Sequence, residues 1–138
     1  MPFDLATTDR LLTTTRAVRK RLDLSRPVPP EVVLDCIRLS QQAPTGSNSQ
    51  GWRWMVVTDP DKRLALSELY RKAGADYLSQ GKQQAEASGH AQTARVLDSA
   101  YYLLEHLHEV PVHVIPCLKG KLPDGVPSAM AAGFFGSV

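Results

Sequence analysis

The chain has few of the features that mark a membrane protein, a disulfide scaffold or a zinc site. No apolar run approaches the length needed to cross a bilayer, and the first residues, Met1-Pro2-Phe3-Asp4, lack the basic and apolar regions of a secretory signal. Cys36 and Cys117 stand alone among apolar neighbours, so they form neither a CxxC pair nor a zinc-ligand set. We therefore expect a cytoplasmic protein without a membrane partner, with buried free thiols.

Excess charge of one sign is also scarce. The 16 Lys and Arg against 14 Asp and Glu give a net charge of +2, too little for an overall field that would attract nucleic acid. Metal ligation is not expected, because His106 and His108 are two residues apart in a predicted helix and His113 lies in a predicted strand. Neither a Walker loop nor a dinucleotide fingerprint occurs, and no nucleophile–base arrangement is evident.

What is present is an ordinary globular composition, with 43% hydrophobic and 22% charged residues among 138. This length predicts a single domain over residues 1–138. The first half predicts a short helix over 7–14 with Leu11 and Leu12 facing inward, then an extended connector over 16–28. A half-buried helix should begin at Pro30, and its inward face is expected to carry Val32, Val33, Cys36, Ile37 and Ser40.

The second half alternates strands and helices. A strand over 52–58 is apolar on both sides, which predicts cover on both faces. Asp59-Pro60 is a helix start, and that helix should reach about Tyr77. The residues available for its burial are Leu64, Leu66, Leu69 and Tyr70. The Gln-rich stretch 79–92 has two interpretations, a mobile surface segment or the frayed middle of a long helix.

A further helix is expected over 93–108, followed by an apolar strand over 110–117 that Pro111 and Pro116 confine to its ends or to a sheet edge. A loop over 119–128 comes next, and 129–135 is expected to be the opening of another helix. The fold class is therefore α+β. Two strands cannot by themselves form a sheet between helical layers, so further strands must come from a partner or from a C-terminal part.

Two segments carry the candidate chemistry. Arg16 and Arg19 lie in the basic run 16–21, and planar guanidinium groups suit a phosphate. The run Ala43-Pro44-Thr45-Gly46-Ser47-Asn48-Ser49-Gln50-Gly51-Trp52 is dense in small donors and acceptors, which suit a flat heteroaromatic ring. Flavin mononucleotide has both parts. The alternatives are a solvated charged face or a nucleic-acid patch for the first segment, and an ordinary polar connection for the second.

Taken in order, these segments resemble the N-terminal part of the nitroreductase family. That family has a basic Arg-Arg-Ser-x-Arg type segment, a Pro-Val-Pro helix entry and an Ala-Pro-Ser-x-x-Asn-x-Gln-Pro-Trp loop before a strand. The resemblance is good over 8–75 and looser as far as Cys117. This chain departs from the pattern at Thr15, Ala17 and Gly51.

The resemblance implies a three-layer fold with helices around a mixed sheet, and two sets of FMN-binding residues. Arg16, Ala17 and Arg19 would contact the phosphate and the ring edge. The flavin-loop residues would be Pro44, Thr45, Gly46, Ser47 and Asn48. Neither a catalytic side chain nor a metal is implied, because the flavin supplies the chemistry.

The implied activity is an FMN-dependent oxidoreductase that uses NAD(P)H to reduce nitroaromatics, quinones or similar electrophiles. The implied assembly is a homodimer with FMN between the subunits. The chain stops at Gly136-Ser137-Val138, inside a predicted helix, so by this resemblance a C-terminal part is missing. The alternative is a shortened, catalytically silent relative that binds or sequesters flavin.

Overall fold

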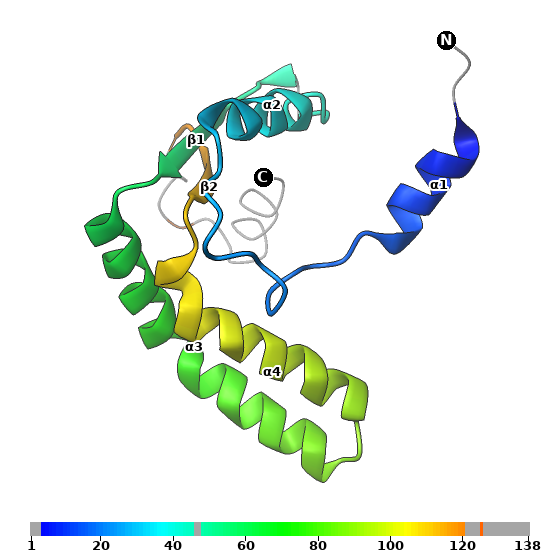
Figure 1. Ribbon diagram of the computed structural model, residues 1–138, viewed down its shortest axis with the longest axis vertical. Coiled ribbons are helices and arrows are strands. Elements are labelled where there is room, and N and C mark those ends of the chain that lie inside the picture. The colour runs from blue at the N-terminus through cyan, green and yellow to red at the C-terminus, as the bar shows by residue number, and fades with distance from the viewer. Residues whose placement is uncertain (1–3, 46–47, 121–124, 126–138) are drawn as a thin grey trace.

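The computed structural model describes residues 4–45, 48–120 and 125. Within them the elements are α1 (Leu5–Thr14), α2 (Pro30–Ser40), β1 (Trp52–Val57), α3 (Pro60–Ala87), α4 (Ala91–His106), the 3-10 helix η2 (Leu107–Glu109) and β2 (His113–Leu118) (Figure 1). The predicted α+β class is confirmed. None of the described helices is both long and apolar enough to span a membrane. The helix expected over 129–135 lies outside the described residues.

The two described strands form an antiparallel pair, with Trp52 opposite Leu118. The N–H of Lys119 donates to the carbonyl of Gly51 at 2.8 Å, which continues the pairing toward the loop before β1. β2 begins three residues later than predicted, beyond Pro111, which has no N–H to donate to a ladder. The sheet therefore joins the end of the 41–51 loop to the end of β2.

The prediction that β1 is covered on both faces is wrong for the described part of the chain. Met55 and Val56 are neighbours and point to opposite faces, yet they are 53% and 42% exposed. Val57 is the residue of β1 that is buried. The described helices cover only part of this sheet, so apolar strand surface is available on both sides.

The closest packing is between α3 and α4, which run side by side (Figure 1). A Cβ on Gly74 would lie 3.3 Å from Cδ1 of Leu104, and one on Gly81 would lie 3.3 Å from Cδ1 of Leu97. The two glycines and the two leucines are each seven residues apart, so the same contact recurs after two helical turns. Leu104 is 1% exposed, which makes it the centre of this small core.

α3 continues beyond its predicted end at Tyr77 and includes most of the Gln-rich stretch. The expected inward residues Leu64, Leu69 and Tyr70 are exposed, so this part of the prediction is wrong. The buried side chains of α3 are instead Ser67, Leu78 and Ala85. The face toward α4 thus consists largely of small residues, which hydrophobicity alone does not identify.

The turn between α3 and α4 follows from Gly89, whose φ of 73° lies in the left-handed region. The N–H of His90 donates to the carbonyl of Ala85 at 2.8 Å, and that of Gly89 donates to Glu86 at 3.1 Å. This pair of hydrogen bonds is a Schellman motif, which satisfies the last carbonyls of the helix. The chain can therefore reverse within three residues and start α4.

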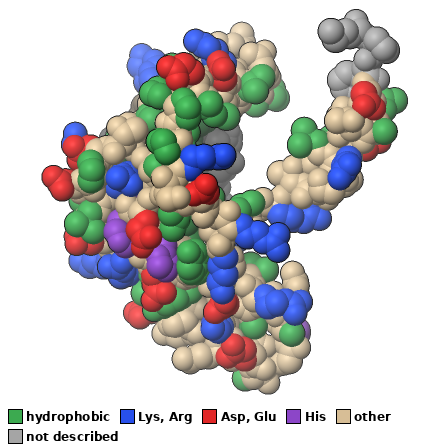
Figure 2. All heavy atoms as spheres, in the orientation of Figure 1, with side chains coloured by type: hydrophobic (Ala, Val, Ile, Leu, Met, Phe, Trp, Pro, Cys, Tyr) green, Lys and Arg blue, Asp and Glu red, His purple; other side chains and the backbone are tan. Residues whose placement is uncertain are grey.

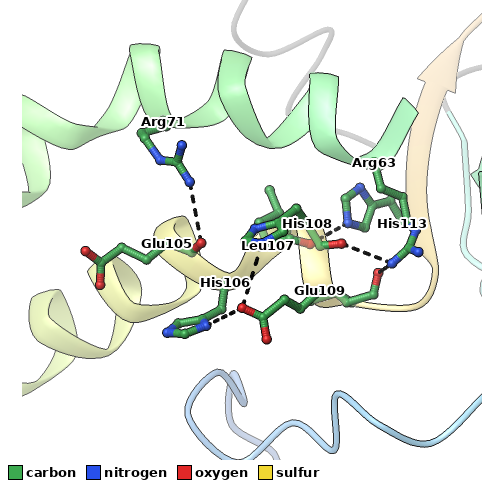
Figure 3. Close-up of polar contacts among 9 residues, drawn as sticks. Arg63, Arg71, Glu105, His106, Leu107, His108, Glu109 and His113 are labelled. Carbon is green, nitrogen blue, oxygen red and sulfur yellow. Dashed lines mark hydrogen bonds and ion pairs between the residues drawn. The ribbon is translucent and has the colours of Figure 1, made fainter. Parts of the chain in front are cut away.

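Arg63 connects α3 to the segment that enters β2 (Figure 3). Its Nη1 donates to the carbonyls of His108 at 3.1 Å and Val110 at 2.7 Å. On the same segment, Nε2 of His113 lies 2.8 Å from the carbonyl of Leu107. These contacts fix η2 between α4 and β2, so the helical pair and the sheet are held together.

The N-terminal helix α1 stands away from the other elements (Figure 1). Its N-cap is Asp4, whose side chain accepts a hydrogen bond from the N–H of Thr7. Leu11 and Leu12 were predicted to face inward, but they are 65% and 72% exposed, because no described element covers α1 (Figure 2). The helix is formed as predicted, and its apolar side chains remain in solvent.

α2 starts at Pro30 as predicted, and Val33 is its one buried residue. Val32 on the expected inward face is exposed. The cysteines are free, but Cys36 is exposed and Cys117 is half-buried, so the prediction of buried thiols is wrong. The reason is that α2 does not close fully onto the sheet.

Candidate functional site

The loop between α2 and β1 folds back on Thr45. The carbonyl of Thr45 accepts the N–H of Asn48 at 3.0 Å, and its hydroxyl accepts the N–H of Gln50 at 3.1 Å. Asn48 and Gln50 have φ values of 52° and 46°, in the left-handed region that few non-glycine residues adopt. Pro44 is exposed before this turn. Gly46 and Ser47, two of the predicted flavin-loop residues, lie outside the described residues.

The side chains of the loop are also organised. Nε2 of Gln50 donates to Oδ1 of Asn48 at 3.0 Å. Beside them is a polar pocket of about 420 Å³, and the residues that line it are Gln41, Gln42, Gln50, Trp52 and Arg53. None of these five residues was predicted as a site residue. The signal was the amide-rich composition of the run 41–50, which already offers donors and acceptors together.

The basic segment lies in the connector between α1 and α2, which we define as residues 15–29. Nη1 of Arg16 donates to the carbonyls of Thr13 at 2.9 Å and Thr15 at 2.7 Å, so this guanidinium partly caps the end of α1. Ala17 is exposed and offers no side-chain donor. Arg16 can therefore reach a ligand with its remaining N–H groups only.

Arg19 differs from Arg16 in its surroundings. It is half-buried and begins a turn in which the N–H of Leu22 donates to its carbonyl at 3.3 Å. Within the described residues its guanidinium makes no hydrogen bond or ion pair. A half-buried arginine with five free donors can bind an anion in bidentate fashion.

Next to Arg19, Lys20 forms an ion pair with Asp98 of α4. Oδ1 of the same carboxylate accepts from Nζ of Lys82 in α3 at 2.6 Å. The hydrogen bonds from Lys20 and then Lys82 lower the pKa of Asp98 from 3.8 to about 2. Conversely, the hydrogen bond to Asp98 raises the pKa of Lys82. The carboxylate is thus ionised at neutral pH and lies between two cations.

The structure does not bring the two predicted segments together within one chain. The connector with Arg16 and Arg19 passes beside the α3/α4 pair, whereas Thr45 and Asn48 lie at the far end of α2 (Figure 1). In the described part of the chain, no hydrogen bond or ion pair joins the two segments. A ligand that contacts both must bridge this separation.

An apolar cleft separates α2 from the sheet. It has a volume of about 340 Å³, and its lining residues are Val28, Val32, Val33, Cys36, Ile37, Ser40, Trp54 and Val114. Nε1 of Trp54 is buried without a hydrogen-bond partner within the described chain. Among all the residues that the structure describes, no group of three or more His, Cys, Asp or Glu is arranged to hold a metal ion.

Comparison with known proteins identifies the family. The model of the nitroreductase family matches residues 12–133. Iodotyrosine deiodinase from Nematostella vectensis is 35% identical over 54 residues, which are 39% of this chain and 20% of that protein. Iodotyrosine deiodinase 1 from Rattus norvegicus is 36% identical over 59 residues, which are 43% of this chain and 20% of that protein.

A solved BluB-like flavoprotein from Clostridium difficile 630 aligns with 93% of this chain and 59% of its own, at a TM-score of 0.46 and 21% identity. The matched part of the chain spans about a fifth of the length of the two deiodinases. The family match covers most of the sequence and includes both candidate segments. The chain belongs to the nitroreductase family.

Proposed function

We propose that this chain binds FMN and acts in an FMN-dependent oxidoreductase that uses NAD(P)H to reduce an aromatic electrophile such as a nitroaromatic or a quinone. The observation that carries the proposal is the family match over 12–133, which contains both the basic connector and the 41–51 loop. The two deiodinase relatives are named for iodotyrosine, which is aromatic, and this supports an aromatic substrate.

The donor set fits the phosphate of FMN. Arg19 supports this best, because it is half-buried and its guanidinium has no described partner. Arginine binds phosphate through two parallel hydrogen bonds, which gives both strength and orientation. Arg16 contributes less, because Nη1 already binds the end of α1. Ala17 offers its backbone only.

The loop around Thr45 fits the polar edge of the isoalloxazine ring. Its turn is held by Thr45, and the left-handed residues Asn48 and Gln50 turn the backbone sharply there. Small side chains leave room for a flat ring, and amide groups match its donors and acceptors. Pro44, Gly46 and Ser47 belong to the proposed flavin loop on the resemblance alone. Bound FMN would supply the redox chemistry, hydride transfer from a nicotinamide and reduction of the electrophile, while these residues would hold the ring and the phosphate.

The separation of the two segments supports a homodimeric site. If one subunit supplies Arg19 and its partner supplies the Thr45 loop, each chain completes the other's pocket. The exposed leucines of α1 and the exposed sheet residues offer apolar surface for such an assembly. The flavin would then lie between subunits. The small-molecule electron acceptor would bind against the exposed face of its ring.

A flavin titration tests the proposal. The chain is purified without added cofactor and titrated with FMN, with riboflavin as the matched ligand that lacks the phosphate. We expect a flavin absorbance or fluorescence change with FMN and weaker binding of riboflavin. Anaerobic NAD(P)H should then bleach the bound flavin, and a nitroaromatic or quinone should restore its colour.

The outcomes separate the candidate functions. Bleaching and recovery support the oxidoreductase. Binding of FMN without bleaching identifies a flavin-binding protein that lacks this activity. No binding of either flavin would overturn the proposal.

A further inference from the structure

Asp98 occupies an unusual position among the charged residues of the helical pair. It lies on α4 and accepts hydrogen bonds from two lysines that come from different parts of the chain. Lys82 belongs to the neighbouring helix α3, whereas Lys20 lies 78 residues away in the connector. One carboxylate therefore joins three segments.

The contact with Lys20 is important because the connector has little else to hold it. Its residues are exposed apart from Arg19 and Leu24, which are half-buried. Its other described hydrogen bonds and ion pairs are local, as in the contacts of Arg16 with Thr13 and of Ser25 with Asp23. Among the described residues, Lys20–Asp98 is the polar contact that joins the connector to a later element.

We propose that Asp98 is a positioning residue for flavin phosphate recognition, because its ion pair with Lys20 fixes the connector so that the adjacent Arg19 is held ready for the phosphate. This inference rests on the proposed FMN function. Lys20 is occupied by Asp98, whereas its neighbours Arg19 and Arg21 make no described side-chain hydrogen bond or ion pair, and Arg19 is the half-buried one of the two. Lys82 binds the other oxygen of the carboxylate, and none of its described hydrogen bonds is to the connector.

The size of the effect follows from the exposure of the pair. Exposed ion pairs contribute little to global stability, so loss of this one should leave the fold intact. Locally, the same contact restricts a segment that is otherwise free. Loss of Asp98 should therefore weaken FMN binding by roughly two- to fivefold, the range that corresponds to an exposed ion pair.

The experiment compares four variants of the full chain by FMN and riboflavin titration. Asp98→Asn and Lys20→Gln should each weaken FMN binding. The double variant should lose no more FMN affinity than the single variant with the larger loss. Lys82→Gln is the matched control, because it removes a lysine from Asp98 and leaves the connector contact in place. Riboflavin binding should change less than FMN binding in all four, because the proposed contact of Arg19 is with the phosphate, which riboflavin lacks.

Two further measurements separate positioning from general damage. In the absence of flavin, trypsin should cleave Asp98→Asn faster than the wild type after Arg16, Arg19, Lys20 and Arg21, because the connector is released. Asp98→Glu keeps the charge and should recover part of the FMN affinity and part of the resistance to cleavage. Glu105→Gln changes the charge of the same helix at an exposed position and should alter neither.

The inference is overturned if Asp98→Asn binds FMN as tightly as the wild type, or if Lys82→Gln loses as much as Lys20→Gln. It is also overturned if the losses in the double variant multiply, since the two residues then act separately. If the wild type binds neither flavin, the proposed function fails and the positioning role fails with it. If the wild type binds FMN and Asp98→Asn binds it equally tightly, the positioning role alone is refuted.

Discussion

Arg19, Lys20 and Arg21 are consecutive cations with different surroundings, so they permit a direct test of phosphate recognition. Arg19 is half-buried and free, Lys20 is paired with Asp98, and Arg21 is exposed. Arg19→Ala should lower FMN affinity by about 1.5–3 kcal/mol, the usual contribution of a charge-assisted hydrogen bond. Lys20→Ala should lose less, because its effect is indirect.

The measurement is an FMN titration of the three alanine variants, with riboflavin as the phosphate-free reference. Arg21→Ala is the control, since it removes the same charge from the same turn and should bind FMN almost as the wild type does. Equal losses for Arg19 and Arg21 would indicate a diffuse basic surface and no defined phosphate site.

Ser67 illustrates how a single buried group affects stability. Its side chain is fully buried, and its hydroxyl has no hydrogen-bond partner among the described residues. A buried hydroxyl without a partner loses its hydration without compensation. Ser67→Ala should therefore stabilise the fold by about 1 kcal/mol in urea denaturation, with a further gain from the better helix propensity of alanine.

Ser79→Ala is the matched control on the same helix, because the hydroxyl of Ser79 donates to the carbonyl of Asp76 at 3.1 Å. This variant should gain less than Ser67→Ala. A loss of stability in Ser67→Ala would mean that the hydroxyl is hydrogen-bonded in solution.

The lowered pKa of Asp98 predicts that the stability of the folded chain depends on pH, with a definite sign. Its folded pKa is about 2 and its ordinary value is 3.8, because Lys20 and Lys82 stabilise the ionised form. The carboxylate thus stabilises the folded chain above pH 3.8, and this contribution disappears as the pH falls through about 2. The stability difference between wild type and Asp98→Asn should be largest above pH 3.8 and should shrink below it.

Urea denaturation of both proteins between pH 5 and pH 2 would measure this difference. The exposed Glu105→Gln variant controls for the loss of a negative charge on α4. A difference between wild type and Asp98→Asn that stays constant across this range would show that the ion pairs with Lys20 and Lys82 do not shift the titration of Asp98.

At the scale of elements, alanine substitutions at the two glycines of α3 should have different effects on stability. Both Gly74→Ala and Gly81→Ala gain about 1 kcal/mol of helix propensity. At Gly74 the new methyl group meets Leu104, which is 1% exposed and cannot move aside. At Gly81 it meets Leu97, which is half-buried and can change its rotamer.

Overpacking costs about 1–3 kcal/mol where a core cannot adjust. Gly81→Ala should therefore be neutral or stabilising, and Gly74→Ala should lower the free energy of unfolding by about 1 kcal/mol after the propensity gain is subtracted. Thermal and urea denaturation of the two variants would measure the order. If Gly74→Ala is more stable than Gly81→Ala, the two helices can separate slightly at Gly74.

The helix starts could be predicted from the sequence, but the inward face of α3, where these glycines lie, could not. Local signals identified the starts of two helices, the Asp59-Pro60 start of α3 and the Pro30 start of α2, but not the end of α3. The inward face of α3 was assigned to its leucines, because a large apolar residue is the usual sign of burial. In the structure α3 approaches α4 at Gly74 and Gly81, where Leu104 and Leu97 of α4 lie against it, and the leucine of α3 that is buried is Leu78.

The candidate site shows the same division. The connector and the 41–51 loop could be selected from residue type alone, because guanidinium groups and small amides have recognisable partners. Their separation in space depends on how α2 and the α3/α4 pair are placed, and local sequence patterns do not encode that placement. The role of Asp98 was also missed, since its partner Lys20 is 78 residues away.

At the scale of the whole molecule, apolar surface and site geometry both favour assembly. Leu11 and Leu12 of α1 and Met55 of β1 are more than half exposed. These residues lie on two separate elements, and association would cover both exposed apolar surfaces. We expect a dimer or a larger assembly in sedimentation at micromolar concentration, and a well-behaved monomer would contradict a flavin site built from two subunits.

A subunit-mixing experiment tests that site more sharply. Arg19→Ala damages the connector, and Asn48→Gly removes the loop side chain while keeping a residue that tolerates the φ of 52°. Each variant alone should bind FMN poorly. When they are mixed in equal amounts and allowed to exchange subunits, half of the dimers contain one chain of each kind.

If the connector of one subunit faces the loop of the other, every mixed dimer has one intact site and one doubly damaged site. FMN binding should then return to about a quarter of the wild-type sites, because half of the dimers regain one site of two. Mixing Arg19→Ala with further Arg19→Ala provides the control and should recover nothing. If the Arg19→Ala and Asn48→Gly mixture also recovers nothing although subunit exchange is demonstrated, Arg19 and Asn48 must serve the same site from one chain. The separation seen in this structure would then have to close within the subunit when FMN binds.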